Sequence, residues 1–141
     1  MLAVNDMFVM AQPHVANFFF EDVKQFLDSH EVRYTARVKL AGKSGYDHGV
    51  DFLIPRSRKR PERILRAIAA PRKENIVAYL WTLSDTRAAR TGESEREPEA
   101  YAFLNDQVQS VGGDVVEALH AYRVKPAVWS QREQYASELA A

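Results

Sequence analysis

The sequence predicts a single α/β domain with a mixed five-stranded sheet and helices on its faces. Three observations support this prediction. The chain has 141 residues, of which 46% are hydrophobic and 11% aromatic, as is ordinary for one globular domain. Segments with helical spacing of apolar residues alternate with short apolar segments, and glycine and proline separate them. The expected order is α-β-β-α-β-α-β-α-β-α over residues 1–141, with 1–12 as a flexible N-terminal segment.

The first three elements are a helix and a β-hairpin. Pro13 suits the first turn of a helix, and apolar residues recur at helical spacing as far as residue 29. Residues 32–40 alternate between apolar and polar side chains, which predicts a half-buried strand with a basic outer face. A glycine-rich turn and a second strand at 50–55 follow. The basic outer face consists of Arg33, Thr35, Arg37 and Lys39.

The middle of the chain predicts a helix, a central strand and a short helix. We expect Pro61 to open a helix that ends near Pro71, because Ile64, Leu65 and Ile68 have helical spacing. Residues 75–83 are apolar on both faces, which is typical of a central strand with Trp81 in the core. Ser84 or Asp85 would then cap a short helix that runs through Arg90.

The last part of the chain predicts a loop, two strands and two helices. The acidic residues 91–99 form the loop, and 101–105 form a strand. Asp114 and Glu117 have the spacing of a capping box for a helix at 115–122. Residues 124–129 predict an edge strand, because Pro126 cannot donate a hydrogen bond within a central strand. Ser130 with Glu133 would cap a final helix.

Composition excludes several classes of site. The absence of cysteine excludes disulfides, thiolate zinc sites and thiol nucleophiles. No apolar run approaches the roughly 18 residues of a membrane span, and the N-terminus lacks the basic start of a signal peptide, so we expect a cytoplasmic protein without a membrane partner. The four histidines lack the spacing of zinc ligands, and we expect each at the surface or at a cap.

The tetrapeptide AGKS at 41–44 superficially matches part of a phosphate-binding loop. Such a loop requires a glycine separated by four residues from the glycine of Gly-Lys-Ser, and here this position is Arg37. The loop must also lead into a helix, whereas a strand is predicted here. We therefore interpret this stretch as a glycine turn with an exposed Lys43.

The motif GKSG-x-x-H-x-x-DF-x-IPRS resembles a bacterial and phage family, the domain of unknown function 1829. The resemblance covers roughly residues 33–135 and includes WTLSDTRAAR, YAFLNDQ and ALHAYRVKPAVWSQRE. It departs from the family at Gly49 and Val50, where the family tends to carry an aromatic residue. The resemblance supports the fold prediction and implies a phage or mobile-element setting, without implying an activity.

Asp51 on the second strand allows two interpretations. In the first, it pairs with Arg37 or Lys39 across the hairpin. In the second, it belongs to a divergent, metal-dependent nuclease of the restriction-endonuclease type, with Glu21 on the first helix as a further Mg²⁺ ligand. The second interpretation lacks the acid-x-lysine pair that such a site needs on the next strand, predicted at 75–83. We expect no cofactor unless this nuclease alternative holds.

The run RSRKR at 56–60 is the strongest signal for binding. It contains no acid and precedes an expected helix start, where backbone N–H groups favour anions. We therefore predict a non-enzymatic binding domain that engages an acidic protein surface or a nucleic-acid backbone. Its predicted contact residues are Lys43, Ser44, His48, Arg56, Arg58, Lys59 and Arg60.

Overall fold

The computed structural model describes residues 4–91 and 96–141, with side chains from Ala16 onward outside that gap. One five-stranded mixed sheet has the spatial order β1-β2-β3-β4-β5. The chain pairs β1 with β2 and β2 with β3 antiparallel, and then β3 with β4 and β4 with β5 parallel. The strands are β1 (Thr35–Ala41), β2 (Asp47–Ile54), β3 (Arg63–Ile68), β4 (Glu99–Leu104) and β5 (Val124–Val128).

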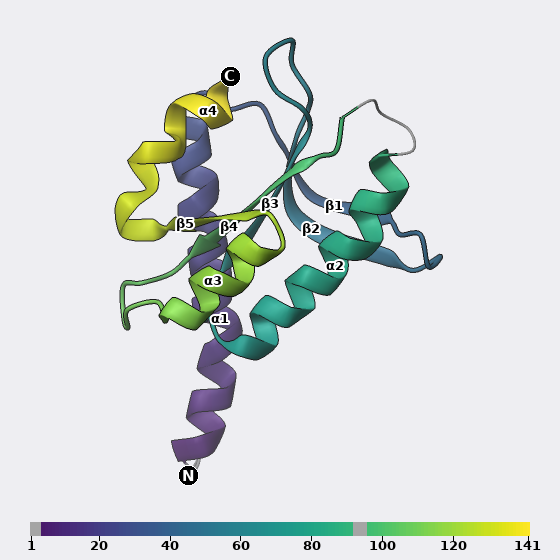
Figure 1. The fold of residues 1–141 in the computed structure, drawn as a ribbon. Coiled ribbons are helices and arrows are strands. Elements are labelled where there is room, and N and C mark those ends of the chain that lie inside the picture. The colour runs from purple at the N-terminus through teal and green to yellow at the C-terminus, as the bar shows by residue number, and fades with distance from the viewer. Residues whose placement is uncertain (1–3, 92–95) are drawn as a thin grey trace.

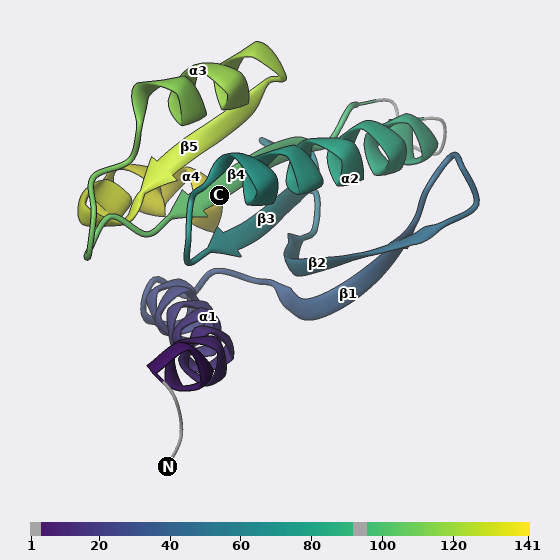
Figure 2. The same cartoon turned by 90° about the horizontal axis from the view of Figure 1, so that it is seen from below.

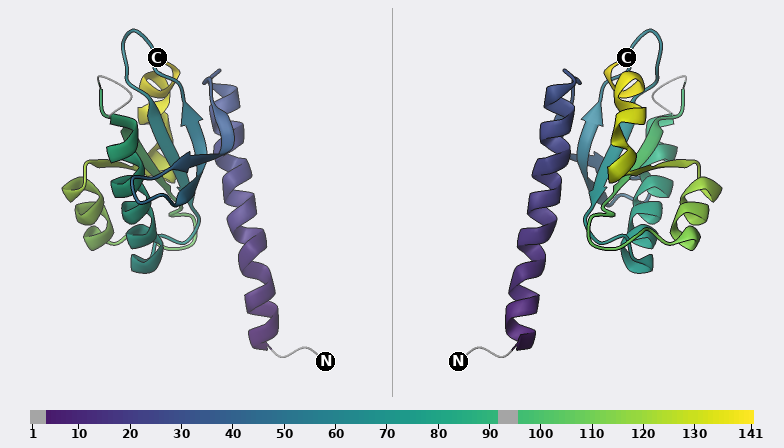
Figure 3. Two further views of the ribbon diagram at one scale, coloured as in Figure 1. Left: turned by 90° about the vertical axis from the view of Figure 1, so that its right-hand side faces the viewer. Right: turned by 90° about the vertical axis from the view of Figure 1, so that its left-hand side faces the viewer.

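Helices cover both faces of this sheet, so the molecule has three layers (Figures 1 and 2). On one face lie α1 (Val4–Ser29), a 3₁₀ segment η1 (Trp129–Tyr135) and α4 (Ala136–Ala140), and their apolar side chains meet those of Phe52 and Phe103. On the other face lie α2 (Lys73–Thr91) and α3 (Gly113–Ala121). The N-terminal part of α1 extends beyond the sheet (Figure 3).

The predicted fold class is confirmed, and so are most of its elements. The strands near 32–40, 50–55 and 101–105 are present, and β5 is an edge strand as Pro126 requires. Thr35, Arg37 and Lys39 of β1 are exposed as predicted, but they do not form one outer face. Ala36 packs with the α1 layer and Leu40 with the α2 layer, and Arg37 between them has a φ of 53°. The first helix begins at Val4 instead of near Pro13. The flexibility of 1–12 stays a prediction, and residues 1–3, like 92–95 of the predicted loop 91–99, lie outside the described residues.

The two elements predicted between 61 and 83 are interchanged. The predicted helix after Pro61 is the strand β3, which is buried between both helical layers and therefore apolar on both sides. The predicted central strand 75–83 and short helix are one 19-residue helix, α2. A short apolar run in a strand covered on both faces cannot be distinguished from a helix by periodicity alone. Trp81, expected in the core, is 54% exposed on α2.

Three predicted caps are also wrong. Ser84 and Asp85 lie inside α2, and Gly112 precedes α3 without a side-chain cap from Asp114 or Glu117. Ser130 starts no regular α-helix; its hydroxyl donates to the Asp106 carboxylate at 2.6 Å, and a 3₁₀ segment follows. Among the described residues, no helix is both long and apolar enough to cross a bilayer.

Candidate functional site

The predicted contact residues fall into two groups at different ends of β2. Lys43 and Ser44 lie in the turn between β1 and β2 and His48 lies at the start of β2, whereas 56–60 belong to the loop that joins β2 to β3. In Figure 1 this basic loop projects at the top and the hairpin turn lies at the right, beside the C-terminal part of α2. The structure therefore separates the two groups and gives the turn a new neighbour.

That neighbour is Asp85 of α2, which binds residues 43 and 44 of the turn through three hydrogen bonds. Its carboxylate accepts from the Ser44 amide at 2.8 Å and from the Ser44 hydroxyl at 2.6 Å. Its backbone carbonyl accepts from the Lys43 amide at 3.0 Å. Ser44 and Asp85 are 41 positions apart in the sequence, so these bonds attach the hairpin to the helix. Ser44 is thus a structural residue of the turn.

His48 completes this cluster from the second strand. Its Nε2 lies 2.7 Å from Asp85 Oδ2, and its ring packs against Trp81 with centroids 4.6 Å apart. His48 is buried, which corrects the prediction that it lies at the surface. Hydrogen bonds from Ser44 and His48 hold the pKa of Asp85 below its usual value.

Two positions of the turn, 42 and 45, need glycine for different physical reasons. A Cβ at Gly42 would lie 1.9 Å from the Asp85 carboxylate, so the close approach of the helix requires glycine there. Gly45 has a φ of +94°, a conformation that other residues rarely adopt. The glycine pattern that superficially matches a phosphate loop therefore reflects a tight turn against α2.

Two aromatic side chains beside this cluster are exposed. Tyr46 is 69% exposed and Trp81 is 54% exposed, and their ring centroids are 6.4 Å apart with a 58° tilt. Lys43 is exposed as predicted, and its side chain forms no hydrogen bond or ion pair with the residues that the structure describes. Tyr46, Trp81 and Asp85 were not predicted as site residues from the sequence. The sequence signal that connects Trp81 with Asp85 is their helical spacing of four.

The basic loop contains a local turn that presents its cations. The Ser57 amide donates to the Arg60 carbonyl at 2.9 Å, and the Arg60 amide donates to the Ser57 hydroxyl at 3.2 Å. Arg56, Arg58 and Lys59 are exposed and have no ion pair within the described part of the chain. The loop leads into β3, so the helix terminus that was expected to assist anion binding is absent from this position.

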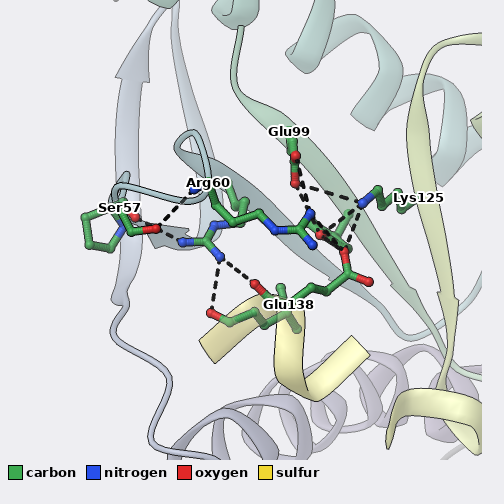
Figure 4. Close-up of polar contacts among 9 residues, drawn as sticks. Ser57, Arg60, Glu99, Lys125 and Glu138 are labelled. Carbon is green, nitrogen blue, oxygen red and sulfur yellow. Dashed lines mark hydrogen bonds and ion pairs between the residues drawn. The ribbon is translucent and has the colours of Figure 1, made fainter. Parts of the chain in front are cut away.

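Arg60 differs from the other three cations because it points toward acids of the domain (Figure 4). Its guanidinium lies 3.7 Å from Glu99 and 3.8 Å from Glu138. Lys125 donates to the same Glu138 carboxylate at 2.9 Å. Although burial works to raise it, the pKa of Glu138 lies below its usual value because Tyr101 and Lys125 donate hydrogen bonds to it. Arg60 therefore has acidic neighbours within the domain, and its role in partner binding stays a prediction.

The nuclease alternative depends on Asp51, and this residue has a structural contact. Its carboxylate accepts a hydrogen bond from the Ala67 amide of β3 at 2.7 Å, and no ion pair with Arg37 or Lys39 is present among the described residues. Glu21 is exposed on α1. No group of three or more potential metal ligands occurs in the described ranges. Neither strand beside β2 has an acid-x-lysine pair, since β1 is TARVKLA and β3 is RILRAI.

A comparison with known protein families gives a match. The model of the family described as Domain of unknown function DUF1829 matches residues 42–132. This range is more than half of the chain and contains the hairpin turn, the basic loop and α2. No curated protein matches the chain.

Proposed function

We propose that this protein, which belongs to the family Domain of unknown function DUF1829, is a binding domain that engages a nucleic-acid backbone through its basic loop. One observation supports the proposal above all others. Arg56, Arg58 and Lys59 are exposed together on one loop and have no acidic partner among the described residues. The phage or mobile-element setting that the sequence resemblance implies stays a prediction.

The physical argument is local charge. The chain has 19 basic and 19 acidic residues, so its net charge gives no general attraction for anions. Arg60 is compensated by Glu99 and Glu138, whereas the three cations beside it keep an uncompensated positive field. Arginine guanidinium groups bind phosphate oxygens in a bidentate geometry, and lysine adds a point charge. A phosphate backbone is therefore the partner whose chemistry fits the loop.

The test neutralises the loop with Arg56→Gln, Arg58→Gln and Lys59→Gln together. Because exposed charges contribute at most about 1 kcal/mol each to stability, the triple variant should fold like the wild type. Fluorescence anisotropy with labelled oligonucleotides, measured across a series of salt concentrations, should show weaker binding. The slope of log affinity against log salt should decrease by about one for each phosphate group that the loop no longer neutralises, up to about three.

The matched control removes the same charge elsewhere. The control variant combines Lys24→Gln on α1 with Arg72→Gln just before α2 and Lys73→Gln at its first residue. This variant should keep the wild-type slope. Equal slopes and affinities for the loop variant and the wild type would contradict the proposal. Binding of poly-glutamate but not of any oligonucleotide would identify an acidic protein surface as the partner class instead.

A further inference from the structure

We propose that Trp81, Tyr46 and Lys43 form a stacking site for an unpaired nucleobase, so that the nucleic acid this domain binds is single-stranded. The inference rests on the proposed function and deepens it, because it names the form of the nucleic acid and a second contact surface. Proteins that bind single strands combine a positively charged path for the backbone with aromatic rings on which bases stack. Both parts are present here.

The aromatic part consists of two exposed rings that do not stack on each other. Trp81 and Tyr46 are 54% and 69% exposed, and their centroid separation of 6.4 Å with a 58° tilt leaves ring surface open to a ligand. Most other large aromatic side chains of the described residues are buried. A neighbouring pair of exposed rings on one surface therefore indicates a contact site. The flat, apolar ring faces suit the face of a nucleobase.

The site is supported rigidly from below. His48 packs against Trp81 with centroids 4.6 Å apart, and its Nε2 lies 2.7 Å from Asp85. Asp85 also accepts hydrogen bonds from both the amide and hydroxyl of Ser44, so the turn that carries Lys43 and Tyr46 is attached to the helix that carries Trp81. A binding site whose supporting shell is already ordered loses little entropy when the ligand binds.

A basic path joins this site to the loop. β2 runs from the hairpin turn to the basic loop, and its eight residues span roughly 26 Å. The edge strand β1 lies alongside it, from Thr35 opposite Leu53 to Ala41 opposite Asp47, and carries exposed cations between the two ends. The exposed cations that remain for a ligand are Arg33, just before β1, and Lys39, because the Arg37 guanidinium lies 4.1 Å from the Phe20 ring centroid and donates to Asn17 of α1. A strand bound at the loop could therefore follow β1 and place a base on Trp81, with Lys43 beside its phosphate.

Tryptophan fluorescence tests the inference directly. The chain has two tryptophans, and Trp129 is buried, so an oligothymidylate of about 15 nucleotides, within the site sizes of single-strand-binding folds, should quench the emission of Trp81 while Trp129 supplies a constant remainder. An abasic oligomer of the same length should bind more weakly and leave the emission unchanged. Trp81→Phe should remove the quenched component and thereby assign it.

Affinity distinguishes stacking from charge. Trp81→Ala and Tyr46→Ala should each weaken oligothymidylate binding by about 5-fold to 100-fold, the range for one base stacked on an aromatic ring, with an unchanged salt slope. The loop variant should instead change the slope and still show quenching of Trp81 at saturation. Tyr122→Ala removes a similarly exposed ring, at 58%, and should bind like the wild type. Circular dichroism should confirm that each variant is folded.

Each result is decisive. If oligothymidylate binds but Trp81→Ala and Tyr46→Ala bind it as tightly as the wild type, or if the abasic oligomer quenches equally, the stacking site is wrong and the basic loop stands. If no oligonucleotide binds the wild type at low salt, both proposals are wrong. Quenching of Trp81 by an acidic polypeptide alone would identify a protein partner and overturn the inference.

Discussion

At the scale of single residues, Asp51 shows how one side chain replaces missing sheet hydrogen bonds. The pairing of β2 with β3 ends at Phe52 and Leu65, and beyond it the two strands separate. There the Asp51 carboxylate accepts from the Ala67 amide, and Arg66 donates to the Gly49 carbonyl. Burial raises the pKa of Asp51, against the opposing effects of the Ala67 bond and the nearby arginines.

We expect Asp51→Ala to lower the free energy of unfolding by about 1–3 kcal/mol, because the Ala67 amide then loses its acceptor in a partly buried place. Asp51→Asn should be at least as stable as the wild type at neutral pH. A raised folded-state pKa means that ionisation of Asp51 opposes folding. The wild type therefore loses stability as pH rises from about 3.9 through that pKa, whereas the asparagine variant, which cannot ionise, keeps its stability. Urea unfolding of the wild type and both variants at about pH 3, below the unfolded pKa, and at about pH 7 measures both effects.

The outcome that contradicts this structural role is equal destabilisation by asparagine and alanine at neutral pH. Asparagine retains an oxygen that can accept the Ala67 hydrogen bond, and it removes only the charge. Equal losses would mean that the carboxylate charge itself is required. Such a result would favour the metal-dependent nuclease alternative. That alternative predicts Mg²⁺-dependent cleavage of nucleic acid by the wild type and its loss in Asp51→Asn.

At the scale of elements, the β1–β2 hairpin depends on α2 for its position. The turn is far from the core of the sheet, and its described contacts to the rest of the domain centre on Asp85. Because the pKa of Asp85 is lowered by bonds from Ser44 and His48, its contribution to stability is complete above the unfolded value of about 3.9. That contribution is lost as pH falls below this value toward the folded-state pKa.

We expect Asp85→Ala to release the turn without unfolding the domain. Amide hydrogen exchange at Ser44, whose amide donates to the Asp85 carboxylate, should be slow in the wild type at about pH 6 and fast in the variant, after correction for the intrinsic rate. In the wild type this protection should be weaker at about pH 3 than at about pH 6, because the contribution of the carboxylate decreases below its unfolded pKa. Ser84→Ala is the matched control, because Ser84 is exposed and its hydroxyl donates only within the helix, to the Leu80 carbonyl. Unchanged protection in Asp85→Ala would show that the turn is ordered by its own strands.

At the scale of the whole molecule, the C-terminal segment closes the face of the sheet that α1 covers. Leu139 is buried at 1% exposure within the core that α1 and β4 share. The buried Arg63 donates to the Glu138 carbonyl at 2.7 Å and to the Pro55 carbonyl at 3.2 Å, and so connects α4 to the base of the basic loop. Figure 4 shows Glu138 of α4 close to Arg60 of this loop. Sequence analysis did not select Arg63, since a buried arginine in a strand has no pattern of its own.

We expect Leu139→Ala to lower the free energy of unfolding by about 2–5 kcal/mol, because apolar burial decreases and a residual cavity forms. The effect should be global, with far-UV circular dichroism and Trp129 emission showing one shared transition in urea. Ser137→Ala, an exposed neighbour on the same short helix, should change stability by less than about 0.5 kcal/mol. A decrease of less than about 1 kcal/mol for Leu139→Ala would mean that α4 is dispensable for the core.

Much of the fold follows from local patterns. The alternation in 32–40, the turn glycines and Pro126 predict the hairpin and the edge strand, because each is a constraint on a few consecutive residues. The helix and strand predicted at 61–70 and 75–83 were interchanged because their patterns depend on how the segments pack in the domain. β3 is covered on both faces, so Ile64 and Leu65 are both apolar although they point to opposite layers, and helical and extended structures then share one pattern.

For the candidate site, local sequence is enough to identify the groups involved, which are a glycine turn with Lys43 and a run of cations at 56–60. Which of these groups are available to a partner depends on the packing of the whole domain. The charge of Arg60 is compensated by Glu99 of β4 and Glu138 of α4. The side chains of Ser44 and His48 instead contact the carboxylate of Asp85 on α2. Trp81 lies outside the core because the segment around it is helical. Charge compensation and exposure depend on residues distant in the chain, so they are properties of the packed molecule.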